Sequence, residues 1–147
     1  MNILKFIATA ICLVGALSNS YAGQADWQKD WEQTLAAAKK EGQVSIYIYR
    51  YEGLLQDFKK DFPGINVVAV SGRGNELTNR IIAERRAGKY IVDVYSGGTN
   101  SLYNTLYKGK ALDAFKPLLV LPEVTDVSKW WGKEHRYADP EGKYIFS

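Results

Sequence analysis

The sequence predicts an α/β fold in which a mostly parallel sheet is flanked by helices. Three short apolar segments indicate buried strands: Val44–Tyr49, Ile65–Val70 and Ile91–Tyr95. Two segments with helical periodicity, Leu54–Phe62 and Glu76–Arg86, alternate with these strands. Strands that are apolar along their whole length and joined by helices are typical of a parallel sheet covered on both faces.

A first helix is expected before the first strand, at residues 26–42. Apolar side chains recur there every three to four positions from Trp27 to Ala38, as on one face of a helix. Asp26 is a suitable N-cap, and Gly42 is a suitable residue to end the helix.

The later helices have their own end signals. Leu54–Phe62 must end before Pro63, because proline disfavours helical geometry in the residue that precedes it. Asn75 is the expected cap of the helix at 76–86. A short helix at 101–108 should follow the third strand, with Leu102 and Leu106 on one face.

The pattern changes after Ala111. Apolar residues are interrupted by Pro117 and Pro122, which predicts an extended segment that crosses away from the sheet. Residues 137–146 predict a turn followed by the beginning of a strand.

Residues 1–22 have the pattern of a secretory signal peptide. A basic start precedes an apolar run from Phe6 to Leu17, and small residues occupy the two positions that a signal peptidase reads, Ser20 and Ala22. The run of about 12 residues is shorter than the roughly 20 that span a bilayer. We expect cleavage after Ala22, no stable membrane anchor in the mature chain, and a periplasmic location.

Cysteine usage and charge exclude several classes of protein. Cys12 is the single cysteine, and it follows Ile11 inside the apolar run, unlike the cysteine of a lipoprotein. Its removal with the signal peptide leaves no thiol for disulfides or metal sites. The formal net charge is +3, and acidic and basic residues are interspersed, so we expect no nucleic-acid partner.

The loops that follow the three strands form the candidate site, because ligands bind at the carboxyl ends of strands in parallel α/β sheets. Nine residues of these loops are candidates by position: Tyr49, Arg50, Arg73, Gly74, Asn75, Glu76, Ser96, Gly97 and Thr99.

Each loop has two interpretations. Glycines beside a helix start can turn backbone N–H groups toward an anion, and Arg73 can add a bidentate contact. The same glycines suit a turn that needs their dihedral freedom. The loop at 96–100 suits an oxyanion or serves only to cap a helix. Arg50, Tyr51 and Glu52 suit contact with a solute or form ordinary surface.

No motif assembles a catalytic set, and we expect no enzymatic activity. His135 is the only histidine, it lies in a polar segment, and we expect it to be solvated. No second histidine or cysteine accompanies it as a metal ligand. Asp93 is expected to bond to a neighbouring loop. The ten tyrosines exceed the needs of packing, and a phenolate is a suitable ligand for a ferric ion.

An ordered series of short motifs runs along most of the predicted mature chain. Its members are Trp31-x3-Leu35-x2-Ala38-Lys39-Lys40-Glu41-Gly42-x-Val44-x-Ile46-Tyr47, Phe58-x3-Phe62-Pro63-Gly64-Ile65-x-Val67, Gly72-Arg73-Gly74-x-Glu76-Leu77-x2-Arg80-Ile81-x-Ala83-Glu84, Gly88-Lys89-Tyr90-x-Val92-Asp93-Val94 and Leu121-Pro122-Glu123-Val124. The series resembles the N-terminal lobe of bacterial extracellular solute-binding proteins of the ferric-iron type, the periplasmic receptors of ABC importers.

The resemblance implies a binding protein whose two α/β lobes close on ferric iron or a small anionic solute and deliver it to the importer permease. The expected division is a signal peptide at 1–22, an N-terminal lobe at 23–115, and a crossing segment with the truncated start of a second lobe at 116–147. In ferric members a tyrosine pair of the far lobe supplies ligands, and that region is absent here. The metal ligands are therefore unknown, and no cofactor is expected other than ferric ion as cargo. With one lobe, binding should be weak or absent.

Two other functions stay open. A secreted α/β hydrolase-like enzyme would need a nucleophile elbow and a partner for His135. A truncated lobe could instead act only as a protein-interaction domain, with the apolar segment at 118–121 exposed and prone to self-association.

Overall fold

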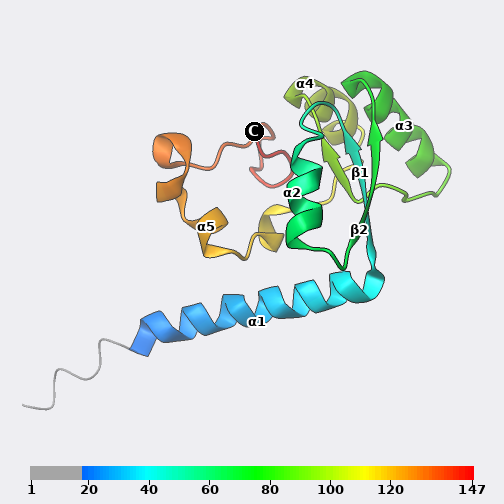
Figure 1. Cartoon of the computed structure of the whole chain (residues 1–147). Helices are drawn as coiled ribbons and strands as arrows, with labels where there is room; N and C mark the ends of the chain where they lie inside the picture. Colours follow the sequence, from blue (N-terminus) through cyan, green and yellow to red (C-terminus); the bar gives the residue numbers. More distant parts are fainter. Residues whose placement is uncertain (1–17) are drawn as a thin grey trace, which may run out of the picture.

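The computed structural model describes residues 18–147 and contains a three-stranded parallel sheet flanked by helices, so the predicted α/β class is confirmed (Figure 1). The strands are β1 (Gln43–Ile48), β2 (Asn66–Ser71) and β3 (Val94–Ser96), and their order in the sheet is β2-β1-β3. Most of the predicted signal peptide, residues 1–17, lies outside the described residues.

The register of the sheet brings the carboxyl ends of all three strands to one edge. Ile48, at the end of β1, pairs with Ser71 of β2 and with Ser96 of β3. Strand β3 begins three residues later than predicted, at Val94. Just before it, Oδ2 of Asp93 accepts the N–H of Ser45 at 2.8 Å, and the backbone N–H of Asp93 donates to the carbonyl of Ser45 at 3.0 Å. The expected structural role of Asp93 is confirmed, although its partner belongs to a strand and not to a loop.

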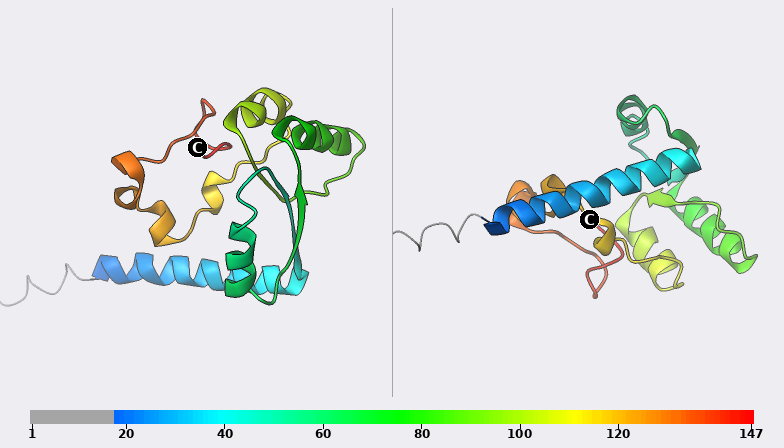
Figure 2. Two further views of the ribbon diagram at one scale, coloured as in Figure 1. Left: turned by 45° about the horizontal axis from the view of Figure 1, so that its top comes forward. Right: turned by 90° about the horizontal axis from the view of Figure 1, so that it is seen from below.

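The first helix is longer than the sequence predicts. Helix α1 (Ser18–Glu41) begins eight residues before Asp26, so the expected N-cap is wrong, whereas its end at Gly42, with φ of +77°, is confirmed. Figure 2 shows α1 extending away from the sheet, which only its C-terminal end meets. None of the helices in the described part of the chain is long and apolar enough to cross a membrane.

Helices lie on both sides of the sheet. Helix α3 (Gly74–Arg86) packs against one face, and helix α2 (Leu54–Asp61) lies on the other side (Figure 2). The central cluster joins strand β1, helix α3 and the segment after β3, and it consists of Tyr47, Leu77, Ile81, Leu106 and Ala111. The helices at 54–62, 76–86 and 101–108 are thus confirmed in type, with small shifts of their ends.

After β3 the chain forms short helical pieces. Helix α4 (Thr99–Ser101) continues into the π-helical η1 (Leu102–Tyr107). Then follow η2 (Lys116–Leu118), α5 (Pro122–Thr125), η3 (Val127–Lys129) and η4 (Trp131–Lys133). The predicted extended crossing segment is therefore wrong in part, because both prolines begin a helical turn, where a missing N–H costs nothing.

The last residues form a turn that Asp139 holds together. Its buried carboxylate accepts three backbone N–H groups, from Lys143 at 2.8 Å, Tyr144 at 3.0 Å and Ile145 at 2.7 Å. The predicted strand reduces to one antiparallel bridge between Tyr137 and Phe146.

Candidate functional site

The structure brings together the loops that follow the three strands. The N–H of Tyr49 donates to the carbonyl of Ser96 at 2.9 Å, which joins the loop after β1 to the end of β3. The N–H of Gly72 donates to the carbonyl of Ile48 at 3.3 Å, which holds the loop after β2 against β1. The predicted site residues therefore come from three neighbouring loops at one edge of the sheet.

The loop after β2 is built as a helix start. The carboxylate of Glu76 accepts the N–H of Arg73 at 3.2 Å, so Arg73 occupies the N-cap position of α3. The expected cap, Asn75, lies inside the helix and is exposed, so that assignment is wrong. Gly74 is tightly placed, because a Cβ there would lie 3.1 Å from the Oγ of Ser101. Helix capping thus explains the hydrogen bond of Glu76, whereas the side chain of Arg73 is exposed to solvent.

The loop after β1 contains a strained backbone. Arg50 and the residue after it, Tyr51, both have φ of 65°, the left-handed region that costs a non-glycine residue about 1 kcal/mol. The guanidinium of Arg50 lies 5.1 Å from the ring centroid of Tyr49. Arg50 is exposed and Tyr49 is half-buried. Two adjacent strained residues at a strand end are a feature that functional sites often share.

The loop after β3 is shaped by the ring of Tyr95. A Cβ on Gly97 would collide with this ring, so glycine is required there by packing. The hydroxyl of Tyr95 donates to the carbonyl of Gly74 at 3.4 Å, and burial raises the pKa of Tyr95. Thr99 begins α4 and is exposed, and Ser96 is half-buried. Tyr95 thus links two of the candidate loops, and no motif around it predicts this role.

The candidate loops form an open surface. Two cavities, of about 450 and 460 Å³, lie elsewhere in the described residues, and none of the nine candidates lines either of them. The cavity of about 450 Å³ is mostly apolar and is lined by residues of β3, η1 and the C-terminal segment. Exposed Arg50 and Arg73 place two cations on the strand-end surface, beside the carboxylates of Glu52 and Glu76, and Glu76 is turned toward the backbone N–H of Arg73. This surface suits an anion held by arginine side chains and backbone N–H groups.

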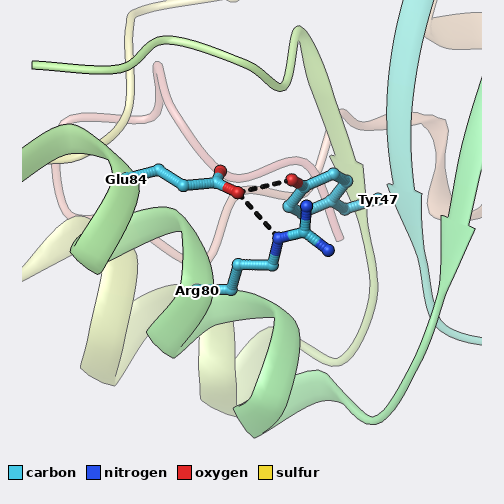
Figure 3. Close-up of polar contacts among 3 residues, drawn as sticks. All are labelled: Tyr47, Arg80 and Glu84. Carbon is cyan, nitrogen blue, oxygen red and sulfur yellow. Dashed lines mark hydrogen bonds and ion pairs between the residues drawn. The ribbon is translucent and has the colours of Figure 1, made fainter. Parts of the chain in front are cut away.

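Sequence reasoning missed a polar cluster between β1 and α3, shown in Figure 3. The hydroxyl of Tyr47 and the Nε of Arg80 both donate to Oε1 of Glu84, each at 2.7 Å. Oε2 of Glu84 is buried without a hydrogen-bond partner. Burial raises the pKa of Tyr47, and its bond to Glu84 raises it further. No signal in the sequence pointed to this cluster, because Arg80 and Glu84 have the i, i+4 spacing of an ordinary helix surface.

His135 is a packed residue and not a solvated one, so that expectation is wrong. It is half-buried, its Nε2 lies 2.7 Å from the carbonyl oxygen of Val124, and its ring meets those of Trp130 and Phe146 at centroid distances of 5.3 and 5.5 Å. These contacts hold the ring between aromatic neighbours.

Among residues 18–147, no three His, Cys, Asp or Glu side chains lie close enough together to hold a metal ion. A comparison of the chain with models of protein families, with curated proteins and with solved structures found no match. The class that the structure defines is an α/β protein with a small parallel sheet flanked by helices.

Proposed function

We propose that the chain is the periplasmic substrate-binding component of an ABC transporter. In this proposal it binds ferric iron or a small anionic solute at the strand-end loops and delivers it to the membrane permease. The ordered motif series from Trp31 to Val124 supports the proposal, as does the α/β fold with its parallel sheet. The chain would act by binding alone, without a reaction.

The observation that carries the proposal is the strained pair Arg50 and Tyr51 beside the hydrogen bond from Tyr49 to Ser96. Folding alone gives no reason to keep two left-handed non-glycine residues in succession. A ligand that contacts the loop only in this conformation supplies such a reason. Arg50 and Arg73 would then meet the negative charge of the solute from two different loops.

The proposed mechanism is closure of a second lobe over the strand-end loops. Because the loops form an open surface, contacts from one side alone leave most of a solute in water. Ligand contacts in both lobes would bias the hinge toward the closed state. Ferric ion enters this scheme as cargo, and phenolate oxygens are the hard ligands that it prefers.

An NMR titration of the 15N-labelled chain with inorganic phosphate tests the proposal. We expect shifts confined to the amides of the three strand-end loops, with a dissociation constant of roughly 1 mM or weaker. Ferric citrate serves as a second probe, whose paramagnetic broadening should begin at the same loops.

The matched variants are Arg73→Gln and Arg86→Gln, which remove one exposed arginine from opposite ends of α3. Arg73→Gln should weaken phosphate binding about fivefold, the size of one exposed charge contact, and Arg86→Gln should leave it unchanged. Phosphate shifts scattered over surface lysines, or equal effects of the two variants, would contradict the proposal.

One observation favours a second candidate, a protein-interaction domain. Leu118 is 73% exposed, as expected for an apolar segment that contacts a partner, although Leu119, Val120 and Leu121 are half-buried. Leu118→Ser should lower any self-association seen by analytical ultracentrifugation. A monomeric wild type would show that this segment does not mediate self-association.

A further inference from the structure

A second pocket lies between the end of η1 and the C-terminal turn. Its volume is about 460 Å³, and none of the nine strand-end candidates lines it. Its lining combines aromatic rings, two cations, one carboxylate and one aliphatic side chain: Tyr107, Lys108, Lys110, Leu112, Glu141 and Tyr144. The pocket thus places a ring-lined wall beside cations.

The aromatic wall is fixed in place. The rings of Tyr103 and Tyr107 stack at a centroid distance of 5.3 Å and an interplanar angle of 16°, and the ring of Tyr144 lies 5.7 Å from that of Tyr107. The hydroxyl of Tyr107 donates to Glu141, and this bond, with burial, raises the pKa of Tyr107 to about 12. Tyr107 is therefore neutral at physiological pH, and its bond to Glu141 holds it against the C-terminal turn.

The two lysines are arranged differently from each other. Lys108 donates from Nζ to Oδ1 of Asn104 at 2.8 Å and lies 5.2 Å from the ring centroid of Tyr103. Lys110 follows a tight turn with φ of 53° and forms no ion pair within the described residues. Lys108 forms no ion pair there either, but its Nζ is held by Asn104, so Lys110 is the cation of this pocket that is left for a ligand.

We propose that this pocket binds an aromatic carboxylate. The ring of the ligand would pack against Leu112 and the tyrosine rings, in the offset or edge-on geometry that aromatic pairs prefer. Its carboxylate would pair with Lys110, and the acceptor-only Glu141 would disfavour a second negative group. This site goes beyond the strand-end loops and does not depend on their function.

Benzoate is the probe that tests the site, in an NMR titration of the purified full chain. We expect saturable shifts at the amides of Lys110, Leu112 and Tyr144. Two compounds related to benzoate separate the contribution of the charge from that of the aromatic ring. Cyclohexanecarboxylate keeps the charge without the aromatic faces, and benzyl alcohol keeps the ring without the charge. Each should bind about fivefold more weakly than benzoate.

Lys110→Gln and Lys133→Gln are a matched pair, because both lysines are exposed and have nearly the same left-handed φ, 53° and 54°. Lys110→Gln should weaken benzoate binding about fivefold, whereas Lys133→Gln, outside the pocket, should leave it unchanged. Arg73→Gln should also have no effect, which keeps this result independent of the strand-end proposal. Benzoate shifts that rise linearly without saturation, equal effects of the two lysine variants, or equal binding of all three probes would overturn the inference.

Discussion

Removal of the Tyr47 hydroxyl tests whether the cluster in Figure 3 stabilises the fold. Tyr47 is 1% exposed, and its hydroxyl donates at 2.7 Å to Glu84, whose side chain is 11% exposed. Tyr47→Phe keeps the ring beneath Arg80 but leaves Glu84 with one donor instead of two. A buried hydrogen bond to a charged acceptor contributes about 2 kcal/mol, and we expect the free energy of unfolding to fall by that amount.

The assay is urea unfolding followed by tryptophan fluorescence, with Tyr90→Phe as the control. Tyr90 is 75% exposed and its ring also lies beneath an arginine, Arg85, at 5.2 Å, so the control removes a hydroxyl without a buried acceptor. Its effect should stay within about 0.5 kcal/mol. The cluster does not stabilise the fold if Tyr47→Phe has the same free energy of unfolding as the control and the slope of that free energy against urea concentration is unchanged.

The pH dependence of the same pair provides a second readout. The pKa of Tyr47 is raised in the folded chain by burial and by Glu84, so the folded state favours the neutral phenol. This stabilisation is complete below the unfolded pKa of about 10 and is lost as the pH rises through the folded pKa. The difference in free energy of unfolding between wild type and Tyr47→Phe should therefore be constant from neutral pH up to the unfolded pKa. It should become smaller at higher pH.

Two further substitutions test the turns that shape the molecule. Gly97→Ala should destabilise by about 2 kcal/mol in urea unfolding, because its Cβ meets the ring of Tyr95, whereas Gly53→Ala, with open space around it, should not destabilise. Asp139→Asn should lower the free energy of unfolding by about 2 kcal/mol at pH 7, whereas Asp61→Asn, at an exposed position, should leave it almost unchanged. Burial alone would raise the pKa of Asp139, but its backbone hydrogen bonds lower it overall, so its stabilisation is present above pH of about 4 and is lost as the pH falls through the folded pKa. An Asp139→Asn deficit that persists unchanged in acid would contradict this account.

The sheet and its helices were predictable because their signals are local. Each strand is an apolar run, and α2 and α3 carry periodic apolar faces over two or more turns. The pieces from η2 to η4 span three or four residues each, which is too short for any periodicity to show. Proline at 117 and 122 was interpreted as a helix breaker, whereas in the structure it starts a helical turn.

The strand-end loops were predictable for a topological reason, since parallel strands must bring their carboxyl ends to one edge. The pocket at the end of η1 was not predictable from the sequence, because it joins Tyr107 to Glu141, which are 34 positions apart with no motif between them. The prediction that His135 is solvated was wrong for the same reason. Its aromatic neighbours gather only when the bridge between Tyr137 and Phe146 closes the C-terminal turn.

The two proposed sites differ in whether they are already formed before a ligand binds, and the phosphate and benzoate titrations test this difference. The strand-end loops are open and strained at Arg50 and Tyr51, so a ligand there gains little until a second surface covers it. The pocket beside Tyr107 is already formed, and its rings need no ordering when a ligand enters. The same chain should therefore bind benzoate more tightly than phosphate. Under the proposed function, closure of a second lobe should reverse that order by strengthening phosphate binding alone.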